Sequence, residues 1–577
     1  MTPASLLGPG TDLGFVDALV GPLDRRIPGI VTDWTDGGYA TAQHRLLAAD
    51  AKALLTALAC PRSRWHRDAE TLLGPAQGLI SQLTTLQGDD GLFGGDNLAS
   101  PPDSSFTVGD VCVMTELIGT TGVGDLPQMG ELYAALAGIR RAVTPALLTG
   151  GVHTPNHRWE LCAALARLHH IEPDPRLPAR IGQWLAEGID IYPDGMYSER
   201  SPLYAAFVTN PSLLVIADVL ARPELEEKVR RNLDAFAPLF DEDGTVESVH
   251  SRRQDQRMRF DGAGFLLQYR RLALRESRGD HARLVTDILA RGVDGEIAGH
   301  ALAEVLLDPR LAGPLPSAGP VRPAVGRTVL ADSGLARVRA GRRGVTVFGG
   351  SDNARFPRIA SGLSTNPTFL RFRQGNAVLE SLRLSVAFFD LGPFRSEGLY
   401  VRGEGRYALT QTTQAHFYQP LPAYRHRADG RYELGDEGRF FASMDFPHRP
   451  TDDHQLRIDA DVDVTESGVD VRLDLRAIPT SYVLELVFRP GGTLKGVRPL
   501  SDPDSYELVE GTGSYTVGGD TIRFGPGNGS GPAQPPVFDD GEQFSYLGAR
   551  DPVPGTRVCI TGRVPSTYTL SLIGTQP

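Results

Sequence analysis

The spacing of apolar residues changes once along this chain of 577 residues. Before about residue 310, apolar side chains recur at helical spacing, as at Leu47, Leu54 and Leu58. After about residue 325, they alternate one by one with polar side chains. The first spacing is typical of amphipathic helices and the second of half-buried strands. The sequence therefore predicts a helical part followed by a strand part.

The helical part consists of separate windows joined by loops rich in Gly, Pro and Asp. Repeated helix pairs of this kind form either an open solenoid or a closed α/α toroid. In a toroid the inner helices run parallel, so their N-terminal ends collect around one mouth. The predicted windows are residues 44–60, 132–148, 156–171, 180–189, 211–220 and 262–274.

The strand part contains clear hairpin signals. Residues 456–464 and 469–475 both alternate apolar and polar side chains, and a turn at 465–468 separates them. A similar pair flanks residues 341–344. We therefore predict an α+β multidomain fold, with a helical α/α toroid followed by an antiparallel β-sandwich. The predicted domains are residues 1–310 (toroid), 311–324 (a linker rich in Pro and Gly) and 325–577 (sandwich).

Composition and charge exclude several partners. The net charge is −12 and no basic run occurs, which argues against nucleic acid. We find no apolar run long enough to span a bilayer, and we predict no membrane association. The first residues lack a secretory signal, so we expect a cytoplasmic protein, or a secreted one whose leader has been removed.

Familiar motifs of metal and cofactor chemistry are missing from the sequence. Its four cysteines are scattered and lack metal-ligand spacing. No HExxH, GxSxG, P-loop or CxxC motif occurs, which excludes zincins, α/β-hydrolases and P-loop NTPases. We predict no metal site and no cofactor.

Two short segments carry the signs of a functional site. Thr154-Pro155 and Ser201-Pro202 each read as an N-cap followed by the first helical residue. Three residues after these caps stand His157 and Tyr204. Unpaired backbone N–H groups and the helix dipole favour negative charge at such positions. The alternative is two ordinary helix starts with a surface histidine and a packed tyrosine.

These two segments also carry a resemblance to a known family. A toroid followed by a β-sandwich, with Asn156-His157 at one helix start and Asp194-Gly195…Glu199…Tyr204 at another, resembles the polysaccharide lyases of the heparinase II/III, chondroitin AC lyase and oligoalginate lyase type. The resemblance implies that Tyr204 is the catalytic phenol. It also implies a histidine from the β-domain, for which His416 is the nearest candidate.

The predicted reaction is β-elimination next to a uronate carboxylate. Removing the proton α to that carboxylate requires its charge to be stabilised, which Asn156 and the helix N-terminus can do. His157 suits the base and Tyr204 the acid, and Tyr204 can serve as both in a syn mechanism. Whether His157, Tyr204 or a β-domain histidine is the base stays open at this stage.

Other residues are candidates for binding the substrate. Glu160 follows His157 on the same helical face and can orient a neighbour, or it is a surface or capping carboxylate. Arg252 and Arg253 can clamp the uronate, or they form a solvated charge run. The remaining candidates are Glu199 beside Tyr204, Asn97 and Asp103 in a polar loop, and the indole of Trp159.

Three functions follow from these observations. The first is a lyase that cleaves an anionic, uronate-containing oligo- or polysaccharide and leaves an unsaturated uronate end. The second is a glycoside hydrolase on the same toroid, with a carboxylate pair drawn from Asp103, Glu160, Asp194 and Glu199. The third is a non-catalytic carbohydrate-binding protein.

Overall fold

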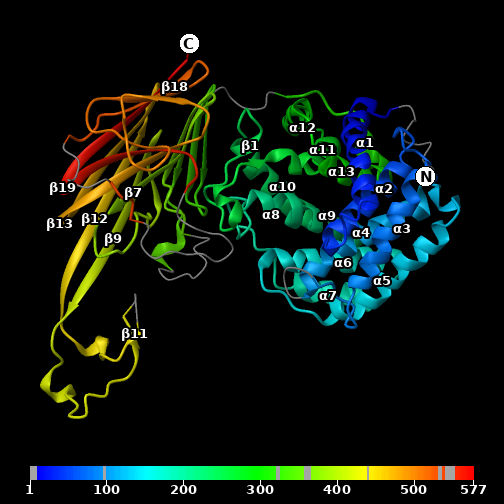
Figure 1. Cartoon of the computed structure of the whole chain (residues 1–577), viewed down its shortest axis with the longest axis horizontal. Coiled ribbons are helices and arrows are strands. Elements are labelled where there is room, and N and C mark those ends of the chain that lie inside the picture. Colours follow the sequence, from blue (N-terminus) through cyan, green and yellow to red (C-terminus); the bar gives the residue numbers. More distant parts are fainter. Residues whose placement is uncertain are drawn as a thin grey trace. The chain divides into compact units, whose positions relative to one another are not determined.

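The chain forms two compact units in a computed structural model (Figure 1). The first unit comprises Met1–Glu247 and Arg259–Arg322, and the second comprises Ser248–Met258 and Pro323–Pro577. The segment Ser248–Met258 interrupts the helical part of the sequence and groups with the strand part. The structure describes residues 10–94, 99–319, 325–355, 365–437, 441–529, 536–539 and 553–576.

The described part of the first unit is a closed ring of paired helices. Its inner helices contact one another in turn, from α2 to α4, α6 and α9, and α13 returns to pack on α2. The inner helices are α2 (His44–Ala59), α4 (Pro101–Thr120), α6 (Pro155–Ile171), α8 (Pro202–Tyr204) with α9 (Asn210–Val219), α11 (Leu266–Glu276) and α13 (Gly295–Leu307).

Each inner helix packs against an outer helix. The outer helices are α1 (Leu13–Thr35), α3 (Ala69–Leu86), α5 (Met129–Thr149), α7 (Arg176–Leu185), α10 (Pro223–Phe236) and α12 (Gly279–Arg291). The predicted α/α toroid is confirmed. It also contains one short hairpin of β1 (Thr245–Val246) and β2 (Phe260–Asp261), which periodicity did not predict.

The two predicted helix starts differ in detail. Ser201 Oγ accepts a hydrogen bond from Tyr204 N at 3.0 Å, so the predicted cap is confirmed. Thr154 occupies the N-cap position of α6, but its hydroxyl makes no capping bond and lies 3.5 Å from Asn156 Oδ1. A π-helical turn, Ala205–Thr209, joins α8 to α9. Such turns recur at functional sites.

Arg270 joins the ends of the ring. Its fully buried guanidinium donates from Nε to Leu311 O at 2.6 Å and from Nη2 to Gly313 O at 2.7 Å. The same Nη2 lies 3.1 Å from Asp12 Oδ2, and the guanidinium stacks 3.5 Å from the centroid of the Phe15 ring. Arg270 therefore ties α11 to the start of α1 and to the residues that follow α13.

One inner stretch is apolar enough to qualify as a membrane span. Among the described residues, Pro202–Val219 has the required length and composition, which our search for apolar runs did not anticipate. Of this stretch, 61% is buried inside the structure, as in the core helix of a globular unit.

The second unit is a β-sandwich, as predicted. Its longest strand, β13, pairs along its first half with β12 and along its second half with β7, and a bulge between Leu475 and Thr480 separates the halves. Strand β19 pairs with both halves of β13. The long strands therefore pass from one sheet into the other, and the two sheets face each other.

On the β7 side the strands continue through β6, β5 and β4 to β3, and on the β12 side through β9 to β8, and hydrogen bonds connect both sides through β13. All these pairs are antiparallel, whereas β16 and β19 are parallel. The strands are β3 (Val325–Leu330), β4 (Leu335–Ala340), β5 (Arg343–Phe348), β6 (Leu370–Gln374), β7 (Ala377–Val386), β8 (Leu399–Gly403), β9 (Arg406–Tyr418), β10 (Gly435–Asp436), β11 (Phe441–Ala442), β12 (Thr451–Val464), β13 (Gly468–Phe488), β14 (Thr493–Lys495), β15 (Arg498–Pro499), β16 (Ser505–Glu507), β17 (Gly513–Val517), β18 (Asp520–Gly525) and β19 (Thr556–Thr575).

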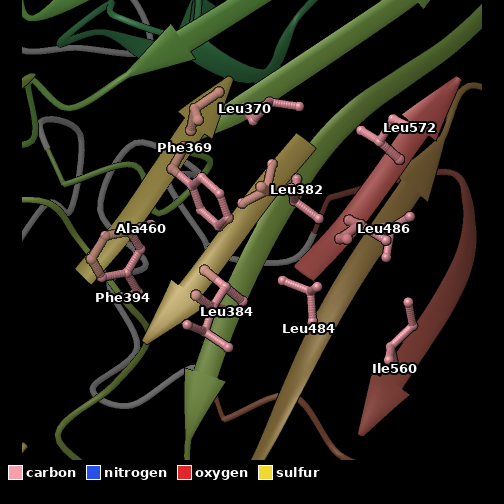
Figure 2. Close-up of a cluster of buried hydrophobic side chains, with 14 of the residues drawn as sticks. Phe369, Leu370, Leu382, Leu384, Phe394, Ala460, Leu484, Leu486, Ile560 and Leu572 are labelled. Atoms are coloured by element: carbon pink, nitrogen blue, oxygen red, sulfur yellow. The ribbon is translucent and has the colours of Figure 1, made fainter. Parts of the chain in front are cut away.

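A continuous apolar core fills the sandwich. Figure 2 shows Leu382 and Leu384 on β7 beside Leu484 and Leu486 on β13, with Phe369 close by. The four leucines occupy every second position on two paired strands, the positions that the period of two assigns to the core. Burial of such side chains is the main stabilising contribution to a sandwich of this kind.

We expect Arg270→Met to destabilise the toroid strongly. The change leaves the carbonyls of Leu311 and Gly313 without a donor, and an unsatisfied buried group of this kind is costly. The free energy of unfolding should fall by about 3 kcal/mol or more in denaturant titration. Arg283→Met, on an exposed ion pair of α12, is the matched control and should change it by less than about 0.5 kcal/mol. Equal effects of the two changes would contradict a role in ring closure.

Candidate active site

The first turn of α6 holds an amide in a defined orientation. Asn156 Nδ2 donates to Glu199 Oε2 at 2.5 Å, and both residues are buried. A carboxylate only accepts hydrogen bonds, so Glu199 sets which end of the amide faces it. The amide nitrogen keeps a second N–H that can donate elsewhere. The spacing of residues singled out Asn156, but it did not reveal that Glu199 is its hydrogen-bond partner.

His157 and Tyr204 start neighbouring inner segments. His157 follows Asn156 in the first turn of α6 and is half-buried, with the His153 ring edge-on at 4.6 Å between centroids. Tyr204 is half-buried in the first turn after Ser201. Because α6 packs against the π-helical turn that follows Tyr204, both side chains belong to one region of the mouth.

Asp103 lies in a cluster at the same end of the toroid, on the first turn of α4. Its carboxylate accepts from His44 Nε2 at 3.0 Å and pairs with Arg45. His44 Nδ1 lies 2.6 Å from Thr107 Oγ1. Burial by itself would raise the pKa of Asp103, but the contacts with His44 and Arg45 outweigh it and lower that pKa.

Sequence reasoning missed His44 and Arg45. Both lie in the first turn of α2, as His157 lies in the first turn of α6. The sequence signal that could have identified them is the pair of polar residues, His44 and Arg45, at the start of an apolar helix. The absence of Ser, Thr or Asp immediately before it hid that signal, because Gln43 occupies the N-cap.

Glu160 lies one turn further into α6 than Asn156. Its Oε2 accepts from Ser212 Oγ of α9 at 2.9 Å. Burial raises the pKa of the Glu160 carboxyl to about 7, and the hydrogen bond from Ser212 only partly offsets this. A carboxyl with a pKa near neutrality can hold or release a proton under physiological conditions. Glu160 is therefore neither a surface nor a capping carboxylate.

Tyr197, in the same segment as Tyr204, has a different environment. Its hydroxyl donates to Asn210 Oδ1 at 2.8 Å and its ring is buried. Burial raises the pKa of Tyr197 well above its usual value. This phenol supports the packing of the segment against α9.

Of two further residues predicted to bind the substrate, the structure contradicts one and does not describe the other. Trp159 is fully buried, with Nε1 donating to Asp190 Oδ1 at 3.2 Å and the Arg158 guanidinium 4.6 Å from its ring centroid. Its indole therefore packs in the core, and the prediction that it stacks on a sugar is wrong. Asn97 lies outside the described residues.

The remaining candidates belong to the second unit. Arg252 forms a two-pronged ion pair with Asp352, at 2.6 Å from Nε and 2.8 Å from Nη2. The half-buried Arg253 donates from its backbone N to Ser251 Oγ at 3.0 Å. His416, on β9, has Nδ1 at 2.7 Å from Asp453 Oδ1 on the neighbouring strand β12. Arg252 and His416 are thus anchored by carboxylates of their own unit.

Among the residues that the structure describes, no group of His, Cys, Asp or Glu could hold a metal ion. The mouth of the toroid instead offers an oriented amide, a histidine and a phenol. Together these groups can stabilise a carboxylate and transfer a proton next to it.

Solved structures share this fold. The Streptomyces coelicolor A3 chondroitin AC lyase, in complex with chondroitin sulphate, aligns with a TM-score of 0.52 and 13% identity over 97% of this chain and 79% of that one. A tyrosine-to-alanine mutant of that enzyme gives 0.50 and 12% over 97% and 82%. Paenibacillus xanthan lyase gives 0.52 and 12% over 98% of this chain and 59% of that one.

The chain has the fold of the α/α-toroid polysaccharide lyases. No family model and no curated protein matches its sequence. At 12–13% identity the likeness shows the lyase fold alone, so a function has to be argued from the residues at the mouth.

We expect Glu160→Gln to stabilise the protein, and more so at higher pH. The unfolded carboxyl ionises near its usual pKa of 4.5, whereas the folded one resists ionisation up to about 7. As the pH rises from 4.5 to about 7, the wild-type chain therefore loses up to about 3 kcal/mol of stability. The Glu160→Gln variant does not, because its amide does not ionise. Thermal melts at about pH 5 and about pH 8 measure the difference. Glu131→Gln on the exposed face of α5 is the control. A stability difference that does not change with pH would contradict a raised pKa.

Proposed function

We propose that this protein is a polysaccharide lyase that cleaves a uronate-containing glycan by β-elimination. The observation that carries the proposal is the Asn156–Glu199 hydrogen bond beside His157, at the N-terminal end of an inner toroid helix. The lyase fold supports it, because the structural neighbours include a lyase in complex with chondroitin sulphate.

The first requirement of the reaction is to stabilise the uronate carboxylate. Loss of its α-proton places a second negative charge on the same group. The N–H of Asn156 that does not face Glu199 can donate to that group, and the N-terminal end of α6 adds backbone donors and its dipole. Glu199 holds the amide in place and so prevents it from turning its oxygen towards the substrate.

The second requirement is proton transfer. In the proposed reaction His157 removes the C5 proton, the electron pair forms the C4–C5 double bond, and the C4–oxygen bond breaks. Tyr204 donates its hydroxyl proton to the departing glycosidic oxygen. The products are an unsaturated uronate and a shortened chain with a free hydroxyl. Each group then returns to its starting protonation state by exchange with water.

A direct assay separates this function from its alternatives. The protein is incubated with hyaluronan, chondroitin, heparan sulphate, alginate and xanthan while ultraviolet absorbance and reducing ends are both measured. A lyase raises both signals, because the new double bond is conjugated with the carboxylate. A hydrolase raises reducing ends alone, and a binding protein raises neither.

We expect Asn156→Ala and His157→Ala each to lower turnover by about 10²-fold or more. Loss of one preorganised donor at a developing charge has this scale. For His157 the change should also remove one ionisation from the pH–rate profile. The matched control is His170→Ala at the exposed end of the same helix, which should retain wild-type rates. Turnover within a few-fold of wild type in both variants, with the fold intact, would rule out this site.

We expect Tyr204→Phe to abolish turnover and leave the melting temperature unchanged. Tyr197→Phe in the same segment should do the opposite. It removes the buried hydrogen bond to Asn210 and should lower stability by about 1–2 kcal/mol, with turnover retained. A substrate with an acidic leaving group should restore turnover to Tyr204→Phe, because that group departs without protonation. Normal activity of Tyr204→Phe on the natural glycan would show that its hydroxyl is not the acid.

A further inference from the structure

The first unit has a partly open cavity of about 520 Å³, lined mainly by its inner helices. The cavity begins close to the mouth, because Phe106 lies one turn after Asp103, and Ala206 and Phe207 lie in the turn that follows Tyr204. Its volume is within the range of small-molecule sites. The polar side chains on its wall include Lys52, Asp110, Arg167, Gln268, His300 and Glu304.

The charges on this wall are matched in pairs. The Lys52 ammonium pairs with Asp110, and Arg167 Nη2 lies 2.6 Å from Glu304 Oε1. Arg271, also on the wall, has Nη1 at 2.7 Å from Asp218 Oδ2. Since each of these cations already has a carboxylate partner, the wall offers little net positive charge to an anionic ligand.

His300 adds a neutral donor. Its Nδ1 lies 3.1 Å from Lys52 Nζ, which can only donate, so Nδ1 is the acceptor and the ring proton is on Nε2. The charge of the neighbouring Lys52 is the main cause that lowers the pKa of His300, to about 4, which favours a neutral ring at physiological pH. The wall therefore presents both donors and acceptors, and His300 adds no charge to it.

Gln268 presents a buried acceptor to the cavity. Its Nε2 donates to Ala206 O at 2.9 Å, which fixes the amide. Its Oε1 has no hydrogen-bond partner among the residues that the structure describes, although the side chain is buried. Buried carbonyl oxygens are almost always paired. A donor from a bound molecule or from water belongs at this position.

We propose that this cavity is a binding site for a neutral sugar. Each sugar hydroxyl both donates and accepts, which suits a wall that carries carboxylate, amide, imidazole and ammonium groups. The Phe106 and Phe207 side chains supply apolar surface for the sugar ring. The paired cations disfavour a uronate here. The proposal goes beyond the elimination reaction, because binding in the cavity requires no bond to be cleaved.

Isothermal titration of the full chain tests this site. The probes are glucose, galactose, mannose, N-acetylglucosamine, cellobiose and lactose, with glucuronic acid as the charged comparison. We expect at least one neutral sugar to bind with one-to-one stoichiometry and glucuronic acid to bind more weakly. Neutral oligosaccharides that end in the preferred sugar form a second arm. Tighter binding of these than of the free sugar identifies the end of a chain as the natural ligand, and equal binding identifies a free sugar.

Two variants locate the binding. Ala49→Phe fills the cavity from α2 and should abolish binding, while Gln268→Met removes the amide oxygen at similar volume and should weaken it by about tenfold or more. Ala134→Phe, exposed on α5, is the matched control and should bind as the wild type does. Melting curves show whether each variant is folded. If only one of the two cavity variants folds, that variant alone tests whether the sugar binds in this cavity.

Three results would overturn the proposal. They are no binding of any neutral sugar or oligosaccharide, binding that survives in a folded Ala49→Phe variant, and tighter binding of glucuronic acid than of every neutral sugar. None of them bears on the elimination reaction, because the ultraviolet assay reports that reaction independently.

Discussion

Closure of the helical ring is the constraint on which the rest of the first unit depends. With α13 packed on α2, the ring brings the start of α2 against the start of α4, and the start of α6 against the residues just before α8. Helix starts leave backbone donors unsatisfied and attract negative charge. Ring closure therefore adds together, at one mouth, the weak attraction for negative charge that each helix start has by itself. The buried Arg270, with hydrogen bonds to Leu311 and Gly313, holds the two ends of the chain segment that forms the ring.

The polar groups of the toroid form two layers. At the mouth, Glu199 orients Asn156, and Asp103 joins two helices through His44. Deeper in the ring, cations and carboxylates are paired with each other, as Lys52 is with Asp110. The outer layer can thus act on a charged group of a substrate, whereas the inner layer suits hydroxyls.

Prediction from sequence succeeded where the signal is local. The periodicity of residues 44–60 and 156–171 matches α2 and α6 within about one residue, because an amphipathic helix shows its buried face at every turn. The hairpin of β12 and β13 was equally clear, with Val464 opposite Val469. The prediction that Trp159 stacks on a sugar was wrong, because the local sequence at a helix start does not show whether an indole faces solvent or the core. Local spacing likewise could not show that Ser248–Met258 groups with the second unit.

The sequence by itself determined the two fold classes, the helix starts and the candidates Asn156, His157 and Tyr204, since each depends on residues within a turn or two. The tertiary structure decided the partners. Asn156 and Glu199 are 43 residues apart, and Lys52 and His300 are 248 apart. Such pairs depend on ring closure, which many weak helix contacts set jointly. The raised pKa of Glu160 has the same origin, because burial by other helices, and not the neighbouring sequence, sets the free energy of its charged form.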